Sequence, residues 1–280
     1  MNVSIIGLGL IGGSIAIELR KKKFAKYLIG VDSSNLHAQT ALNLGLVDEL
    51  NSLDDAILKS DLIILAVPAD ICLILLPKIL GKVNQQIITD VCSTKENICT
   101  KVLNHNKRKN YVAAHPMAGT EHSGPWAAQE GLFDGKAVIL SDTEDSSANA
   151  VEIVEKMYDT LNMNPIYMSA QNQDMHAAYV SHISHISSFA LALTVLDKEK
   201  NEKNIFNLAS GGFDSTVRLA KSSAEMWVPI FDQNAANVSL VLSAYIEQLT
   251  QFQKAINSHN QVQMTNMINN ANRIKKVLKA

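Results

Sequence analysis

The chain has 280 residues, of which 47% are hydrophobic and 19% charged, and its formal net charge is −2. That length fits two domains better than one small domain, and the composition is that of a globular protein with sizeable cores. The near-neutral charge balance excludes a strongly basic surface, so we expect no nucleic-acid partner.

Residues 1–168 alternate between short apolar runs and helical patterns, which predicts βαβ units and a mostly parallel sheet. The near-continuous apolar character of the strands indicates burial on both faces. Strands are predicted at Val3–Ile6, Leu28–Val31, Leu62–Ala66, Ile87–Thr89, Val112–Ala114, Ala137–Leu140 and Pro165–Met168. Helices are predicted at Ile11–Arg20, Leu36–Leu44, Ala69–Leu80, Lys95–Val102 and Ala148–Leu161.

After about residue 170 the strand signal is absent and long apolar helical patterns follow. We therefore place a domain boundary after residue 168 and expect residues 169–280 to form an all-α domain. Long apolar helices of this kind often bury surplus apolar surface in a dimer, so a homodimer is expected. The predicted helices are Asp174–Leu196, Ser215–Ala220, Glu225–Lys254 and Asn260–Val277, with a charged connection at Lys198–Lys203.

Neither the N-terminus nor the cysteines indicate export or a metal site. Residues 1–6 enter a strand without a basic leader, and no apolar run reaches the roughly 18–20 residues of a membrane span. Three cysteines without a C-x-x-C pair argue against a disulfide framework or a zinc site. We expect a soluble, cytoplasmic protein with reduced thiols, no membrane partner and no metal.

A glycine-rich turn, Gly7-Leu-Gly-Leu-Ile-Gly12, follows the first predicted strand and opens the first predicted helix, with Asp32 20 residues beyond Gly12. In this context the pattern predicts a dinucleotide site, with the pyrophosphate at the helix N-terminus. Asp32 would accept hydrogen bonds from the ribose hydroxyls and repel a 2′-phosphate, which favours NAD over NADP. The expected cofactor-binding residues are Gly7, Gly9, Leu10, Ile11, Gly12, Asp32, Val67 and Pro68.

Reactive residue types gather in three further segments. The first is Asp90–Lys95, which leaves a predicted strand, and the second is the loop His115–Gly124, which begins at the end of another. Strand ends that face the ligand crevice of an open α/β sheet are where chemistry is done, so His115 is a candidate acid or base.

The third segment, in the helical half, contains His182, His185 and Arg218. The two histidines share a helix face, where they could bind a metal or simply pack, and no carboxylate at helical spacing supports the metal. Arg218 could form a bidentate clamp on a carboxylate or a surface salt bridge.

Taken together, five segments resemble the prephenate dehydrogenase family, which includes the arogenate dehydrogenases of tyrosine biosynthesis. They are Gly7–Ser14, Asp90–Lys95, His115–Gly124, Ser181–His185 and Gly211–Trp227, which occur in order along nearly the whole chain. The resemblance implies a Rossmann domain at residues 1–168 and a helical dimerisation domain at residues 169–280. It also implies NAD-dependent oxidative decarboxylation of prephenate to 4-hydroxyphenylpyruvate.

The resemblance also implies roles for individual residues. His115 is expected to be the catalytic histidine that binds the C4 hydroxyl of the substrate, and Ser93 to orient that histidine or hydroxyl. Arg218 is expected to bind a substrate carboxylate, and Glu121 to gate the pocket. The expected substrate-binding residues are Arg218, His185, Ser181, Glu121, Thr120 and Trp227.

Two departures from the family's pattern and three alternatives remain open. Gln173 precedes Asp174 where many members carry a histidine–aspartate pair, which leaves the role of both residues open. The chain ends after a helix, so we expect any feedback by tyrosine to act at the active site.

The alternatives are an arogenate dehydrogenase, another hydroxyacid or imino-acid dehydrogenase, and a catalytically silent NAD-binding protein. A hydroxyacid dehydrogenase is disfavoured because the long helix offers Ser181, His182 and His185 in place of a lysine.

Overall fold

A computed structural model describes residues 1–200 and 205–277 of the chain. The described residues form two compact units, one comprising residues 1–235 and the other the residues that follow. The first unit contains the sheet, the helices that cover it and the first helices of the C-terminal half.

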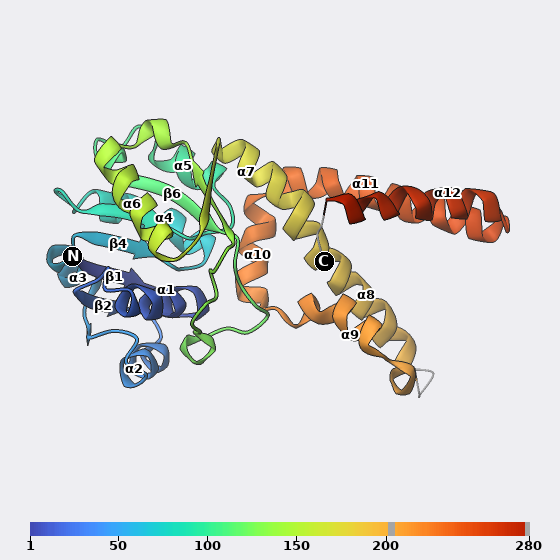
Figure 1. Cartoon of the computed structure of the whole chain (residues 1–280), viewed down its shortest axis with the longest axis horizontal. Coiled ribbons are helices and arrows are strands. Elements are labelled where there is room, and N and C mark those ends of the chain that lie inside the picture. The colour runs from blue at the N-terminus through green and yellow to red at the C-terminus, as the bar shows by residue number, and fades with distance from the viewer. Residues whose placement is uncertain (201–204, 278–280) are drawn as a thin grey trace. The chain divides into compact units, whose positions relative to one another are not determined.

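The first unit is built on one eight-stranded sheet, with strand order β3-β2-β1-β4-β5-β6-β7-β8 (Figure 1). Neighbouring strands are parallel throughout except for β6 and β7, which pair antiparallel. The mostly parallel sheet predicted from the sequence is confirmed. The strands are β1 (Asn2–Ile6), β2 (Tyr27–Val31), β3 (Glu49–Leu50), β4 (Leu62–Leu65), β5 (Ile87–Asp90), β6 (Tyr111–Pro116), β7 (Ala137–Ser141) and β8 (Asn164–Met168).

Helices cover both faces of the sheet and enclose two apolar cores. Alternate residues of each central strand enter opposite cores: Leu62 and Ile64 of β4 lie in one, and Ile63 and Leu65 in the other. This alternation explains the uninterrupted apolar runs, since both sets of side chains are buried. The first core contains residues of α1 (Leu10–Lys21), α2 (Asn35–Asn43) and α6 (Ala148–Thr160). The second contains residues of α3 (Leu53–Lys59), α4 (Ala69–Leu80) and α5 (Glu96–Val102).

Three local expectations need correction. Strand β8 is not buried on both faces: it is an edge strand, and Ile166 and Tyr167 are exposed. The sequence pattern also missed β3 and α3, which have two and seven residues, too few for a periodic signal.

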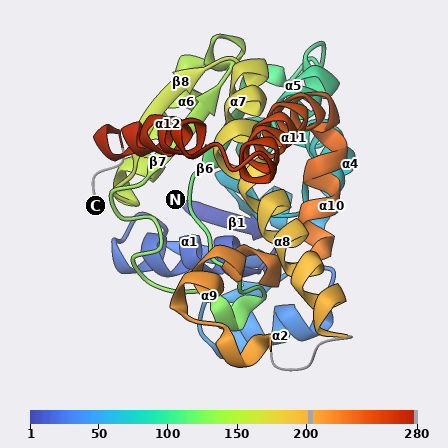
Figure 2. The same cartoon turned by 90° about the vertical axis from the view of Figure 1, so that its right-hand side faces the viewer.

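The predicted helices of the C-terminal half are broken into shorter elements. Asp174–Leu196 was expected as one helix, but α7 (Ala170–Ala177) passes through a π turn (Ala178–His182) into α8 (Ile183–Glu199), as Figure 2 shows. The predicted helix Glu225–Lys254 is interrupted at Asn234, which separates α10 (Ala224–Gln233) from α11 (Ala235–Asn257). The remaining helices are α9 (Gly211–Val217) and α12 (Gln261–Ala271), and 3₁₀ turns span Arg108–Asn110, Pro125–Ala127, Thr143–Asp145, Phe206–Leu208, Arg218–Lys221 and Asn272–Lys276. Of the predicted charged connection Lys198–Lys203, residues 201–203 lie outside the described residues.

One helical stretch, Ala170–Glu199, is long and apolar enough to cross a membrane by length and composition alone. This finding differs from the expectation that no apolar run reaches the length of a membrane span, although polar residues lie within the stretch. Three of those polar residues, Gln173, Asp174 and His182, are buried and hydrogen-bonded within the first unit. The same stretch exposes apolar side chains such as Leu193 and Leu196, and exposed apolar surface of this kind is typical of a protein or membrane interaction site.

The turn between β1 and α1 has no room for a side chain at Gly12. A Cβ there would lie 2.0 Å from the carbonyl oxygen of Gly7, whereas a Cβ on Gly9 would meet nothing within 4 Å. We expect Gly12→Ala to lower the free energy of unfolding by about 3 kcal/mol, the upper part of the range for overpacking. Denaturant unfolding measures it, with Gly9→Ala as the matched control that stays near wild type. Equal stability of the two variants would contradict this view of the turn.

Candidate active site

The glycine-rich turn leaves the carboxyl end of β1 and opens α1 without a side-chain cap. Gly7 has φ +96°, a left-handed conformation suited to glycine, and Gly9 occupies the N-cap position of α1 with no side chain to accept a hydrogen bond. The first N–H groups of a helix have no intrahelical acceptor, and the helix dipole is positive there. The open space over Gly9 therefore fits the pyrophosphate of a dinucleotide.

Asp32 lies directly after β2 and is held in place by the main chain. Its carboxylate accepts hydrogen bonds from the N–H groups of Leu8 and Ser34, both at 2.8 Å. His37 has its Nδ1 4.0 Å from the same carboxylate and packs edge-on against Trp126. The carboxylate is thus fixed beside the glycine-rich turn, in the position where a ribose hydroxyl is bound in dinucleotide folds.

The segment Asp90–Lys95 is organised around a buried ion pair that the sequence pattern did not reveal. Asp90 and Lys95 have no exposed side-chain surface, and the Lys95 ammonium donates to the Asp90 carboxylate. The other oxygen of that carboxylate accepts from the Tyr111 hydroxyl at 2.7 Å. Burial disfavours the charge on Lys95, but the neighbouring carboxylate outweighs it and keeps the pKa of Lys95 above its ordinary value.

His115 lies near the end of β6, at the same edge of the sheet as the glycine-rich turn, and is 7% exposed. Its Nδ1 lies 3.1 Å from Oε1 of Gln173, and its Nε2 has no hydrogen-bond partner among residues 1–200 and 205–277. Burial, and secondly the Lys95 charge, lower the pKa of His115 from 6.5 to about 4. The imidazole is therefore neutral near pH 7, the form that can accept a proton.

The expected pairing of His115 with Ser93 takes a different form in the structure. The hydrogen bond of the His115 ring goes to Gln173, whose Nε2 donates in turn to the main-chain carbonyl of Ser93 at 2.9 Å. Ser93 is thus joined to His115 through its backbone, and the role of its hydroxyl remains a prediction. Sequence reasoning left Gln173 without a role, and its only signal was the departure from a histidine–aspartate pair.

The helix residues His182 and His185 do not share one environment. His182 is fully buried, accepts a hydrogen bond from Asn234 Nδ2 at 3.1 Å and leaves its buried Nε2 without a partner in the described residues. Burial lowers its pKa to about 4.

His185 is half-buried; its Nδ1 donates to the Ser181 carbonyl, and its ring stacks on Trp227 with a centroid distance of 3.5 Å. Burial lowers the pKa of His185 as well. Ser181 and Trp227, expected in the pocket, thus contact His185.

Arg218 is paired with Glu121, which joins the loop after β6 to the 3₁₀ turn after α9. The guanidinium donates to the carboxylate at 2.9 Å, and the Arg218 side chain is 50% exposed. The backbone N–H of Glu121, and secondly Arg218, keep the pKa of this carboxyl below its ordinary value. Thr120, next to Glu121, accepts a hydrogen bond from the His122 N–H. A substrate carboxylate that bound Arg218 would compete with Glu121 for the guanidinium.

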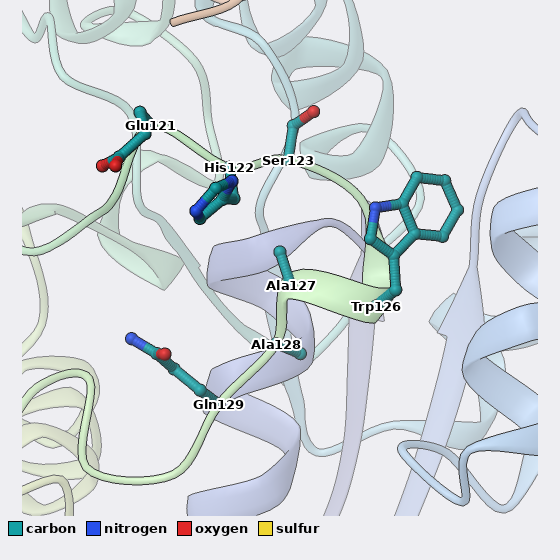
Figure 3. A pocket seen from close by; sticks show the side chains of 7 residues that line it. All are labelled: Glu121, His122, Ser123, Trp126, Ala127, Ala128 and Gln129. Atoms are coloured by element: carbon teal, nitrogen blue, oxygen red, sulfur yellow. The ribbon is translucent and has the colours of Figure 1, made fainter. Parts of the chain in front are cut away.

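An open hollow of about 720 Å³ is lined in part by Glu121 (Figure 3). In Figure 3 the Glu121 carboxylate and the Trp126 indole lie at opposite ends of the lining. His115 is not part of the lining. The lining residues are Glu121, His122, Ser123 and Trp126–Gln129.

One buried cluster has side chains of the types that bind metals. Its possible ligand atoms lie within 4.8 Å of one another and belong to Cys72, Asp90 and Cys92. The Asp90 carboxylate already binds the Lys95 ammonium, and a cation there would face that charge. A hydrogen bond to Cys92, and then burial, raise the pKa of the Cys72 thiol, so Cys72 is a protonated packing group.

Comparison with known proteins agrees with this architecture. Residues 15–167 match the sequence model for the nucleotide-binding domain of prephenate dehydrogenase, and residues 169–270 match the model for its dimerization domain. The chain belongs to the prephenate dehydrogenase family.

Two curated relatives illustrate the range of names in the family. A prephenate dehydrogenase of Bacillus subtilis is 32% identical over 83% of this chain, which covers 64% of that protein. The chain thus spans a little under two thirds of that relative. A cyclohexadienyl dehydrogenase of Zymomonas mobilis is 28% identical over 92% of this chain and 89% of its own length.

Solved structures of the family match nearly the whole chain. Prephenate dehydrogenase of Aquifex aeolicus, in complex with hydroxyphenyl propionate and NAD⁺, has a TM-score of 0.86 at 28% identity and covers 99% of this chain and 97% of its own. Arogenate dehydrogenase of Synechocystis has a TM-score of 0.78 at 26% identity, with 99% of both chains covered.

Because the pKa of His115 is lowered in the folded protein, the stability of the protein should depend on pH. Between pH 6.5 and about 4 the unfolded chain binds a proton that the folded His115 does not, so stability falls as pH falls. From pH 7 to pH 5 this group alone should lower the free energy of unfolding by about 2 kcal/mol. Urea unfolding at pH 7 and pH 5 measures the loss of unfolding free energy between the two pH values. We expect this loss to be smaller in His115→Asn than in the wild type by about that amount. Equal declines in the two proteins would contradict a neutral, buried imidazole.

Proposed function

We propose that this protein is an NAD⁺-dependent prephenate dehydrogenase that converts prephenate to 4-hydroxyphenylpyruvate and CO₂ in tyrosine biosynthesis. The observation that carries the proposal is the neutral, buried imidazole of His115 at the sheet edge where the glycine-rich turn opens α1. The family membership and the NAD⁺-bound Aquifex relative support it.

The cofactor would be held by the turn between β1 and α1, by Asp32 and by the segment after β4. Gly9 and the N-terminus of α1 would bind the pyrophosphate, and the Asp32 carboxylate the adenosine ribose. No arginine follows Asp32 to pair with a 2′-phosphate, which favours NAD⁺ over NADP⁺. NAD⁺ bound there would supply the acceptor for the hydride that leaves C4 of the substrate. Val67 and Pro68 are proposed to line the same crevice.

His115 would act on the hydroxyl group at C4 of the ring. Its neutral Nε2 takes the hydroxyl proton as C4 becomes a carbonyl carbon, and a positioned base typically contributes about 10²–10⁴-fold to such a step. The ring carboxylate then leaves as CO₂, and its bonding electron pair moves through the ring to the C4 oxygen. The protonated imidazole can return its proton to that phenolate, so the reaction releases no net proton and the ring becomes aromatic.

Arg218 is proposed to bind a carboxylate of the dianionic substrate. In a chain of net charge −2, a fixed cation near the pocket is needed to hold two negative charges. Its pairing with Glu121 supports the gating role proposed for that residue, because the substrate carboxylate would exchange with the Glu121 carboxylate. Thr120, Ser181, His185 and Trp227 are proposed to complete the pocket, and Ser93 to orient His115 or the hydroxyl.

Arogenate is the second candidate substrate, favoured by the arogenate dehydrogenase of Synechocystis among the matching structures. It differs from prephenate only by an amino group in place of the keto group of the side chain. The chemistry proposed for His115 and Arg218 is the same for both substrates, because the reacting hydroxyl and the ring carboxylate are shared.

We further propose a cytoplasmic homodimer. The match of residues 169–270 to a dimerization domain supports it, as do the exposed apolar side chains of α8 and α11. These include Leu193, Leu196, Leu240, Ile246 and Leu249.

The proposal is tested by mixing the purified protein with NAD⁺ and prephenate. We expect NADH absorbance and CO₂ in equal amounts, a smaller rate with NADP⁺, and a rate with arogenate that sets the substrate preference. The His115→Asn variant should bind NAD⁺ like the wild type but lose about 10²–10⁴-fold in kcat. Absence of NADH with both substrates would overturn the proposal in favour of a catalytically silent NAD-binding protein.

Removal of the guanidinium at Arg218 should weaken substrate binding rather than the chemical step. Hydrogen bonds to charged groups contribute about 1.5–3 kcal/mol, so KM for prephenate in Arg218→Ala should rise roughly 10- to 100-fold. Steady-state kinetics measure it, with Lys221→Ala as control, because Lys221 carries the same charge on the same 3₁₀ turn and pairs with Asp214. An unchanged KM would show that the carboxylate is bound elsewhere.

A further inference from the structure

The side-chain amide of Gln173 has only one orientation that its surroundings allow. Gln173 is fully buried, and its Nε2 lies 2.9 Å from the Ser93 carbonyl oxygen and 3.0 Å from Oδ1 of Asp174. Both neighbours accept hydrogen bonds, so the nitrogen must face them and donate one hydrogen to each. A flipped amide would place its oxygen against a carbonyl oxygen and a carboxylate oxygen, an unfavourable contact between acceptors with no hydrogen to share.

Asp174 is itself fixed as an acceptor by the main chain at the start of α5. Its two oxygens accept from the N–H groups of Lys95 at 2.7 Å and Glu96 at 2.9 Å. Burial raises the pKa of Asp174, but these N–H donors favour its ionised form. Oδ1 of Asp174 already accepts from the Lys95 N–H, so it faces Gln173 as an acceptor, and the orientation of the amide follows from the main chain of the segment Ser93–Glu96.

The orientation of the amide decides which nitrogen of His115 carries the hydrogen. With its nitrogen engaged, Gln173 presents Oε1 to Nδ1 of His115 at 3.1 Å. An amide oxygen only accepts, so Nδ1 must be the donor. A neutral imidazole has one N–H, and its other nitrogen, Nε2, is then left with a free lone pair.

We infer that Gln173 is a positioning residue that fixes His115 in the tautomer protonated on Nδ1 and thereby leaves Nε2 as the base. The inference rests on the proposed function for the step that Nε2 performs, while the tautomer itself is independent of any substrate.

The tautomer is observed directly by ¹⁵N NMR of the histidine-labelled, full-length protein at pH 7, because protonated and unprotonated ring nitrogens resonate far apart. The His115→Asn variant assigns the His115 signals by their loss. We expect wild-type His115 to show a protonated Nδ1 and an unprotonated Nε2. In Gln173→Met, which keeps the length but lacks the acceptor, a population protonated on Nε2 should appear.

Kinetics test whether the tautomer matters for the reaction. We expect kcat of Gln173→Met to fall by about 10²-fold, because the base is present in the wrong tautomer, while KM for NAD⁺ stays unchanged. Gln86→Met is the matched control: Gln86 is a partly buried glutamine whose amide bonds only main-chain groups near residues 57 and 84–85. It should leave both the His115 signals and kcat at wild-type values.

Three results would overturn the inference: wild-type His115 protonated on Nε2, an unchanged tautomer in Gln173→Met, or a shifted tautomer with unchanged kcat. If Gln173→Met does not fold, the wild-type spectrum still decides the first of these. A protein that is inactive with prephenate and arogenate but shows Nδ1 protonated would refute the proposed function and leave the tautomer assignment standing.

Discussion

A pair of opposite charges, Asp90 and Lys95, is enclosed between the ends of β5 and β6 without exposed side-chain surface. The Asp90 carboxylate also accepts from the Cys92 N–H, the Tyr111 hydroxyl and the Ala114 N–H. Removing one partner of such a pair costs about 3–5 kcal/mol, because the remaining charge is buried and uncompensated. The pair thus fixes the segment that leaves β5 against the strand that carries His115.

The rest of the candidate site depends on that fixed segment. Its main chain presents the Lys95 N–H to Asp174 and the Ser93 carbonyl to Gln173, and these contacts orient the amide that reaches His115. The Lys95 charge also acts on His115 directly, since it adds to burial in lowering the pKa of the imidazole to about 4. One buried ion pair therefore supports both the position and the neutrality of the proposed base.

The sequence predicted the strands and helices of the first 168 residues well because apolar periodicity is a local signal. Helix α4 was predicted with its observed ends, and only the short β3 and α3 were missed. Breaks in the helical half were not foreseen, because neither the π turn nor the end of α10 at Asn234 carries a glycine or proline at that point. The dense polar motifs indicated where the site lies. The hydrogen bonds within the site join residues far apart in the sequence, such as Gln173 and Ser93, 80 residues apart. Such contacts cannot be deduced from sequence spacing.

Nε2 of His115 is the proposed base, and Gln173 holds the opposite side of the ring. A crystal structure of the protein with NAD⁺ and an unreactive ring-hydroxyl analogue of the substrate tests it most directly. We predict Nε2 within about 2.6–3.2 Å of the ring hydroxyl, with Nδ1 still bonded to Gln173. A ring turned to present Nδ1 to the hydroxyl, or a hydroxyl bound away from His115, would contradict the account.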